Sequence, residues 1–67
     1  MKSLGDLKIG DKLISQETGE GCEISDIYMD KDIRDKQEVY YYFRGFSVPR
    51  KLLKAFFITK HGDFMTA

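Results

Sequence analysis

Cys22 and His61 carry the side chains best suited to nucleophilic chemistry, and each is the only residue of its type among the 67. Nucleophilic catalysis needs a nucleophile, a base and a group that orients the base. Cys22 alternates with Ile24, a pattern typical of a small buried apolar side chain, and His61 precedes Gly62 in a turn, where an exposed histidine is ordinary. The paired carboxylates of the chain lie in no apolar setting that would raise their pKa. We therefore predict that the protein is not an enzyme.

Metal and cofactor sites are not expected either. One cysteine and one histidine are too few for a Cys/His zinc site or a disulfide framework. Residues 30–35 contain three aspartates, but an EF-hand loop needs glycine at its sixth position and glutamate at its twelfth, where Asp35 and Tyr41 stand. Gly19 and Gly21 lack the third glycine and the flanking elements of a dinucleotide-binding loop. The predicted cofactor content is therefore none.

An aromatic stretch at residues 38–46 is the clearest sign of a binding function. It holds five of the nine aromatic residues of the chain, and its Val, Tyr and Phe composition favours a strand. Successive side chains of a strand point to opposite faces. One predicted face carries Val39, Tyr41 and Phe43, and the other carries Tyr40, Tyr42 and Phe46. The first face is assigned to the core, and the second is the candidate binding face.

Basic residues follow this aromatic stretch, and two classes of partner suit an aromatic face with a basic rim. Single-stranded nucleic acid would stack on the rings, for roughly 1–3 kcal/mol per base, and contact the rim through phosphate. A protein partner would use Tyr, Phe and Arg, which are enriched at interfaces. The predicted binding residues are Tyr40, Tyr42, Arg44, Phe46, Arg50, Lys51 and Lys54.

Charge favours the protein partner. The chain has 11 basic and 11 acidic residues, and a neutral molecule has little general attraction for phosphate. Residues 1–43 carry six basic and ten acidic residues (−4), whereas residues 44–67 carry five basic and one acidic (+4). The acidic part suits a basic partner surface, or else the two parts interleave and attract each other. A further alternative is that the second aromatic face packs beneath residues 47–58 or forms a homodimer.

The length and the termini of the sequence bound the class of protein. A chain of 67 residues is long enough for one domain, in which folding buries about 60% of the surface of the unfolded chain. One unpaired thiol fits a reducing compartment, and the first residues form no apolar signal segment. The longest apolar run, residues 39–43, is too short to span a bilayer. We expect a single domain over residues 1–67, cytoplasmic and without membrane contact.

Turn residues divide the first half of the chain into strands. Gly10 and Asp11 predict a turn before a strand at about residues 12–16, and residues 17–21 predict a hairpin loop. A second strand is predicted at about residues 22–29, where the apolar phase shifts at Ser25 and Asp26. Such a shift predicts a bulge or a sharp bend. Three apolar anchors precede the first strand: Leu4, Leu7 and Ile9.

The remaining segments are an exposed loop, predicted at residues 30–38 from its polarity, and residues 47–58, which have two interpretations. A helix could begin near Pro49 and place Leu52, Leu53, Phe56 and Phe57 on one face. Alternatively, one helical turn precedes a strand with Leu53, Ala55 and Phe57 pointing inward. The β-rich composition of residues 56–59 favours the strand, followed by a hairpin turn at residues 60–63 and a strand at residues 64–66.

The spacing of Gly10, Asp11 and Leu13, and then of Gly21, Cys22, Ile24 and Ile27, resembles the opening of SH3-like small β-barrels of the Tudor and KOW types. In those families a Gly-Asp turn starts the first strand, and a glycine before alternating apolar residues starts the second. The resemblance covers about residues 9–28. It implies a mainly β fold, a strongly bent five-stranded barrel with a short helical turn or helix near residues 48–57. It also implies a docking surface without catalysis.

One residue departs from the KOW pattern. Glu20 stands before the hairpin glycine, where a basic residue is common in those families, and this argues against RNA binding. The small size and the lack of a catalytic site also suit an accessory or phage-derived protein that modulates a larger complex. We therefore expect a non-enzymatic module that docks a protein partner, with nucleic-acid binding as the alternative.

Overall fold

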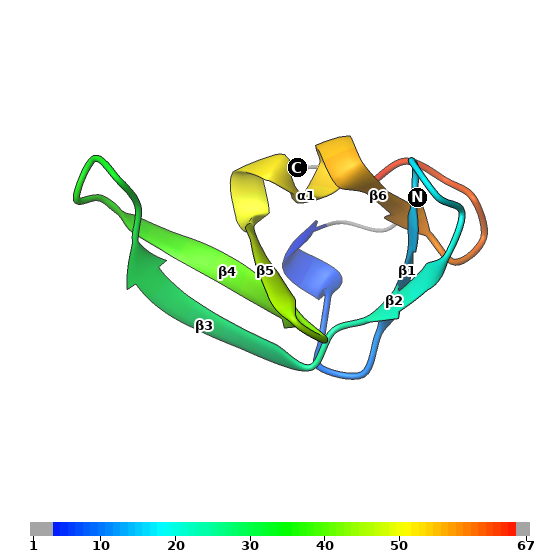
Figure 1. Cartoon of the computed structure of the whole chain (residues 1–67), viewed down its shortest axis with the longest axis horizontal. Coiled ribbons are helices and arrows are strands. Elements are labelled where there is room, and N and C mark those ends of the chain that lie inside the picture. The colour runs from blue at the N-terminus through cyan, green and yellow to red at the C-terminus, as the bar shows by residue number, and fades with distance from the viewer. Residues whose placement is uncertain (1–3, 66–67) are drawn as a thin grey trace.

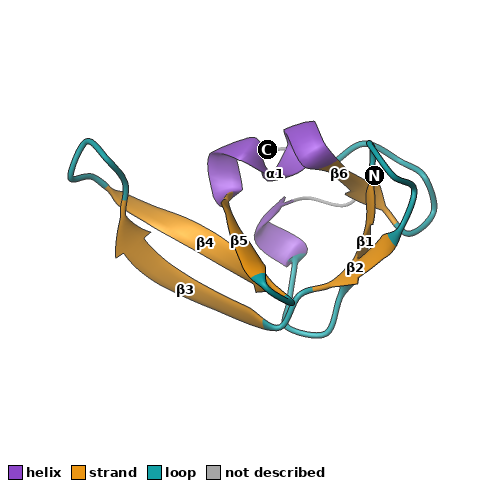
Figure 2. Cartoon of the chain, viewed as in Figure 1, coloured by secondary structure: helices purple, strands orange, loops and turns teal. Residues whose placement is uncertain are grey.

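Strands account for most of the regular structure in the computed structural model, which describes residues 4–65 (Figure 2). The elements in chain order are the 3-10 helix η1 (Leu4–Asp6), the strands β1 (Lys12–Ser15), β2 (Gly21–Glu23), β3 (Asp26–Lys31), β4 (Gln37–Phe43) and β5 (Phe46–Pro49), the helix α1 (Arg50–Phe56), and the strand β6 (Phe57–Thr59). The predicted mainly β class is therefore confirmed.

The six strands form two antiparallel sheets, ordered β2-β1-β6 and β3-β4-β5. Figure 1 shows the sheets on opposite sides of the molecule, with α1 passing over the space between them. Helix α1 contacts β4 and β5 of one sheet and β6 of the other. The sheets are not closed into a barrel.

The bend expected after the first hairpin is confirmed, and it divides the predicted second strand between the two sheets. The Ile24 amide donates to the Asp11 carbonyl oxygen at 2.9 Å, on the β1 side, whereas the Ser25 amide donates to the Tyr42 carbonyl oxygen at 2.8 Å, on the β4 side. Consecutive residues thus pair with different sheets. The shift in apolar phase marks the position where the chain changes sheet.

The N-terminal segment agrees with the sequence in two of its three anchors. Leu4 and Leu7 are buried, but Ile9 is 61% exposed, so its assignment to the core was wrong. Ile9 precedes Gly10, which has a φ of +97°, and lies in the turn before β1. The apolar side chain of Ile9 is therefore held in an exposed turn and is not packed in the core. The turn itself and the strand that follows it are as predicted.

The polar segment at residues 30–38 is only partly a loop, so its predicted extent was wrong. Strand β3 continues through Lys31 and β4 begins at Gln37, and the register pairs Asp30 with Glu38 and Lys31 with Gln37. Strand pairing is made by backbone hydrogen bonds. At the tip of a hairpin, where both faces of the strands are exposed, polar side chains do not prevent this pairing. Polarity alone therefore overestimated the loop.

Residues 47–59 combine the two interpretations of the sequence. The helix interpretation is correct for Arg50–Phe56, and the strand interpretation for Phe57–Thr59. Leu53 is fully buried, but Leu52 and Phe56 are 42% and 49% exposed, so the helix has a narrower buried face than predicted. After β6 the chain turns at Gly62, and no strand forms at residues 64–65. Residue 66 of that predicted strand lies outside the described residues.

The hydrophobic core lies between the two sheets and is closed by η1 and α1. The Tyr41 hydroxyl donates to the Leu4 carbonyl oxygen at 3.2 Å and ties η1 to β4. Burial raises the pKa of Tyr41, and the nearby charge of Arg50 opposes that rise. The buried apolar residues are Leu4, Leu7, Leu13, Ile24, Tyr41, Phe43, Val48, Leu53, Phe57 and Met65.

Candidate functional site

Three tyrosines line the outer face of the β3-β4-β5 sheet, and we call this surface the tyrosine face. It consists of Tyr28, Tyr40 and Tyr42. The register places Tyr28 opposite Tyr40, and their rings stack with centroids 5.6 Å apart and planes 15° from parallel. Tyr42 is 39% exposed, and the other two are half-buried. An antiparallel sheet can keep one face in water, and this face is the open one.

The alternative in which the second aromatic face packs beneath residues 47–58 is wrong. Ser47 pairs with Tyr42 and Pro49 pairs with Tyr40 as the neighbouring strand of the same sheet. The segment therefore extends the face sideways and does not cover it. Helix α1 directs Leu53 into the core on the other side of the sheet.

Acidic residues border the tyrosine face. Asp26 lies opposite Tyr42, and Asp30 lies opposite Glu38, one row beyond the stacked pair. The pKa of Tyr40 is raised mainly by its burial, and further by the negative charges of Asp32, Asp30 and Glu38. The charges of these carboxylates therefore act on the Tyr40 hydroxyl. Asp32 is itself paired with Arg34 and Lys51.

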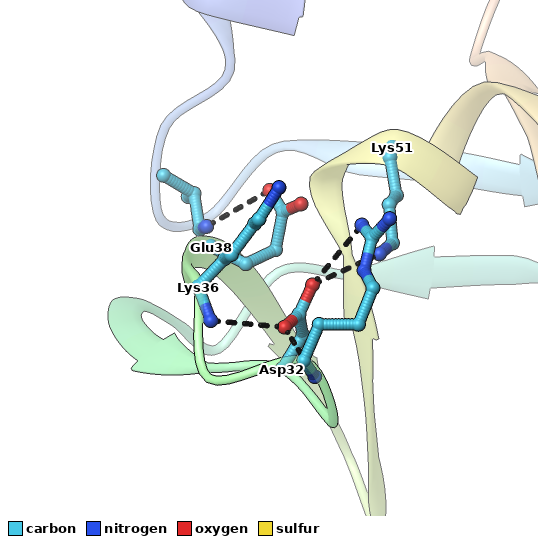
Figure 3. Close-up of polar contacts among 6 residues, drawn as sticks. Asp32, Lys36, Glu38 and Lys51 are labelled. Atoms are coloured by element: carbon cyan, nitrogen blue, oxygen red, sulfur yellow. Dashed lines mark hydrogen bonds and ion pairs between the residues drawn. The ribbon is translucent and has the colours of Figure 1, made fainter.

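Asp32 organises the turn between β3 and β4 (Figure 3). One oxygen of its carboxylate accepts the amides of Arg34 at 2.8 Å and Lys36 at 3.1 Å. The other accepts the Arg34 guanidinium and the Lys51 ammonium, both at 3.3 Å. These bonds, the Lys36 amide first among them, lower the pKa of Asp32 from 3.8 to about 2. Asp32 thus joins the tip of the hairpin to the first turn of α1.

The predicted basic residues come from α1 and from the turn between β4 and β5, and not from the strands that carry the tyrosines. Arg50, Lys51 and Lys54 lie on α1 and line a hollow of about 370 Å³ together with Leu4 and Glu38. Of these cations, Lys51 is paired with Asp32. The remaining predicted cation, Arg44, lies in the turn between β4 and β5. Lys51 thus reaches the β3–β4 hairpin through Asp32, whose charge also acts on Tyr40.

Phe46 lies on a different face from the one predicted. It pairs with Phe43 in the register, and the two rings stack with centroids 5.3 Å apart. Directly opposed residues share a face, so Phe46 belongs with Phe43 and not with Tyr42. Strict alternation assumed one continuous strand, whereas Arg44 and Gly45, whose φ is +93°, form a turn that reverses the chain.

Phe46, which is 45% exposed, borders a second candidate surface, which we call the edge groove. It runs between β2 and β5 as two hollows of about 380 and 290 Å³ that share Cys22 and Phe46. Val48, Phe56 and Phe57 also line the larger hollow. Cys22, expected to be a buried small side chain, is half-buried and packs against the core from this groove.

Candidate catalytic and metal-binding groups are sparse in the described part of the chain. His61 is exposed, and its amide donates to the Thr59 hydroxyl at 3.3 Å. No group of three or more His, Cys, Asp and Glu side chains within residues 4–65 is arranged to hold a metal ion. In the same range, no helix has the length and apolar character needed to cross a bilayer.

Sequence reasoning did not single out Tyr28 or Phe56, two residues that shape these surfaces. Tyr28 occupies the same face of β3 as Asp26 and Asp30, two residues away on either side. This spacing would have placed Tyr28 on a polar, exposed face if the strand had been predicted to reach Lys31. Phe56 had no comparable signal, because its exposure depends on where α1 ends. Comparison with known proteins gives no further guide: no family model, no curated protein and no solved structure matches the chain.

Proposed function

We propose that this chain is a non-enzymatic binding module whose tyrosine face docks a basic region of a protein partner. The observation that carries the proposal is the row of half-buried Tyr28 and Tyr40 and exposed Tyr42 beside three carboxylates. Tyrosine supplies a large contact area at interfaces, and the faces of aromatic rings attract lysine and arginine side chains. The carboxylates of Asp26, Asp30 and Glu38 add charge complementarity to the same cations. Such a module fits an accessory role in a larger complex.

Single-stranded nucleic acid, the alternative that the sequence raised, suits this surface less well. Stacking platforms for single strands lie in positively charged grooves that follow the phosphates. Here the charges that raise the pKa of Tyr40 are mainly those of carboxylates, and Lys51 is paired with Asp32. Phosphate binding beside the tyrosines would therefore begin with electrostatic repulsion.

We also propose that the fold is a variant of the SH3-like small barrel. Taking β2 and β3 as halves of one bent strand reduces the six strands to five. The bent strand then joins the two sheets at Ile24 and Ser25, and a short helix precedes the last strand. These features support the resemblance. The terminal strands of the combined order, β5 and β6, do not pair within residues 4–65, and this is where the present structure departs from a closed barrel.

The proposed function is tested by titrating isotope-labelled protein with a lysine- and arginine-rich peptide and, separately, with single-stranded oligonucleotides at low and physiological salt. We expect the peptide to shift the resonances of Tyr28, Tyr40 and Tyr42, and Tyr42→Ala to weaken its binding about tenfold or more, in the range of a modest hot spot. Phe64→Ala is the matched control, because Phe64 is an exposed aromatic residue, at 64%, outside the tyrosine face.

Three outcomes would overturn the proposal. Shifts of the tyrosine resonances by oligonucleotide and not by the basic peptide would assign the face to nucleic acid. Equal loss of peptide binding in Tyr42→Ala and Phe64→Ala would show that the effect is not specific to the face. Concentration-dependent shifts of the same resonances without any ligand would assign the face to a homodimer.

A further inference from the structure

The outer edges of the two sheets differ in how many of their backbone groups are hydrogen-bonded within the chain. At the edge of β6, all of the outward backbone groups are bonded. The Phe57 amide donates to the Leu53 carbonyl oxygen, and the Phe57 carbonyl accepts the Gln16 side-chain amide at 3.2 Å. The Thr59 amide donates to the Asp63 carbonyl oxygen at 2.8 Å, and the Thr59 carbonyl accepts the Gly62 amide at 2.9 Å. No backbone group of Phe57 or Thr59 is left for another strand.

Two of the outward backbone amides at the edge of β3 are bonded to its own aspartates. The Ile27 amide donates to the Asp26 carboxylate at 2.9 Å, and the Lys31 amide donates to the Asp30 carboxylate at 2.8 Å. The Asp32 amide bonds to the Lys36 carbonyl on the β4 side. In an antiparallel pair every second residue bonds to the partner strand, so the amides of Ile27 and Lys31 point away from β4. Carboxylates along an edge also discourage pairing with another chain.

The edge of β2 has no such protection. The Ser15 amide bonds to the Glu20 carbonyl, and the Ile24 amide to the Asp11 carbonyl. These bonds set the phase of the ladder, so the backbone groups of Gly21 and Glu23 point away from β1. Within residues 4–65, β2 pairs with β1 alone. This leaves two N–H and two C=O groups on the outer edge of β2. Both Gly21 and Glu23 also line the smaller hollow of the edge groove.

The edge groove has a chemistry that selects its occupant. Its floor is apolar, with Cys22 and Phe46 at the centre and Phe56 beside them, 49% exposed. Its rim is mostly acidic: Glu17 and Glu20 line the larger hollow, and Glu23 and Arg44 line the smaller one. An occupant that satisfies the strand edge, covers the floor and matches the rim must be extended, apolar on one face and basic on the other.

We propose that the edge groove accepts an extended segment of a partner protein, with alternating apolar and basic side chains, as an added antiparallel strand beside β2. Adding a strand to an exposed edge combines backbone hydrogen bonds with side-chain selection at alternate positions. The partner residues opposite Gly21 and Glu23 exchange backbone bonds with them and direct basic side chains toward the solvent beside the glutamates. The partner residue opposite Cys22 directs an apolar side chain onto the groove floor. This site is separate from the tyrosine face and does not depend on its function.

The test uses the whole labelled chain and a short, terminally capped peptide of alternating valine and lysine. At a peptide concentration of about ten times the dissociation constant, the amide hydrogens of Gly21 and Glu23 should exchange about tenfold more slowly, because only the unoccupied fraction exchanges. Alkylation of Cys22, the only cysteine in the chain, should slow in parallel. Two methylated peptides separate strand pairing from simple charge attraction. N-methylation of the lysine amides, which face β2, should abolish the protection, whereas N-methylation of the valine amides should preserve it.

Charge reversal tests the selectivity of the rim. Glu23→Lys should weaken binding of the valine–lysine peptide about tenfold and favour binding of a valine–glutamate peptide, because it reverses the charge at the rim. The variant should still fold, because the Glu23 side chain is exposed and has no role in the core. Asp6→Lys makes the same change of charge at an exposed residue outside the groove and should leave both peptides unaffected. Equal binding of the two methylated peptides, or protection confined to the tyrosine face, would overturn the proposal. Protection of Gly21 and Glu23 that depends on protein concentration, without peptide, would assign the edge to a second copy of the chain.

Discussion

Tyr41 and Tyr42 are neighbours in the chain but lie in opposite environments. Tyr41 is 3% exposed and its hydroxyl bonds to the Leu4 carbonyl oxygen, whereas Tyr42 is 39% exposed on the tyrosine face. Alternation along β4 is the physical cause, because adjacent side chains of a strand point to opposite faces of the sheet. The two residues therefore separate a stabilising role from a binding role.

We predict that Tyr41→Ala lowers the free energy of unfolding by roughly 3 kcal/mol or more, the usual cost of removing a core aromatic side chain. Tyr42→Ala should cost less than about 1 kcal/mol, because part of its ring is already hydrated. Chemical denaturation followed by circular dichroism measures both. Tyr41→Phe serves as a control that keeps the ring and loses only the bond to Leu4, for about 0.5–1.5 kcal/mol. Equal and large losses for both alanine variants would contradict the assignment of the faces.

At the level of elements, the β3–β4 hairpin is held to α1 through one carboxylate. Asp32 accepts bonds from two amides of its own turn and from the Lys51 side chain of α1. Its side chain is only 8% exposed, which is unusual for an aspartate in a turn. The polar tip of the hairpin is thereby fixed against the rest of the molecule.

The lowered pKa of Asp32 makes this contribution dependent on pH. The folded state holds the pKa at about 2, against an ordinary value of 3.8, so the stabilisation is complete above about pH 4 and is lost as the pH falls toward 2. Asp32→Asn should therefore lower the melting temperature at neutral pH, and its difference from the wild type should shrink between about pH 4 and pH 2.

Thermal unfolding at a series of pH values measures this difference. Asp35→Asn is the matched control, because it removes another carboxylate from the same turn. The Asp35 side chain is 82% exposed and forms an ion pair with Lys31 at 3.4 Å. Asparagine also tolerates the φ of +62° at that position. A difference between wild type and Asp32→Asn that stays constant down to pH 2 would contradict the linkage.

Over the whole molecule, two separate sheets share one core. Leu13 and Phe57 contribute to it from one sheet, and Tyr41 and Phe43 from the other. The rings of Phe43 and Phe57 stack across the sheets with centroids 4.8 Å apart. The chain passes between the sheets at Ile24, which is 1% exposed. Neither sheet can bury its apolar face without the other.

This arrangement predicts cooperative unfolding. Ile24→Ala should lower the free energy of unfolding by about 2–5 kcal/mol, the range for a large aliphatic residue in a core, and should do so equally for both sheets. Tyrosine fluorescence reports the β3-β4-β5 sheet, which holds all four tyrosines of a chain without tryptophan, and far-ultraviolet circular dichroism reports both sheets. Coincident transitions by the two probes are expected. Separate transitions would show that the sheets are independent.

Much of the local structure could be predicted from residue types. The aromatic strand, the first hairpin, the turns at Gly10 and Gly62 and the bend near Ser25 follow from alternation and turn chemistry, which act over a few residues. The same local rules separated Tyr41 from Tyr42. They failed for Phe46, because two turn residues changed the phase, and for residues 30–38, because strand pairing overrode polarity.

The candidate sites depended on contacts between segments that are distant in the sequence. The stacking of Tyr28 on Tyr40 requires the β3–β4 register, and the carboxylates beside the tyrosines come from both strands. Three of the four cations expected around them are on α1, where Lys51 pairs with Asp32, 19 residues earlier. The edge groove is formed by β2 and β5, two strands that do not pair. Composition indicates which residues can bind, but the register and the packing of the sheets determine which of them meet, because these depend on the burial of the whole core.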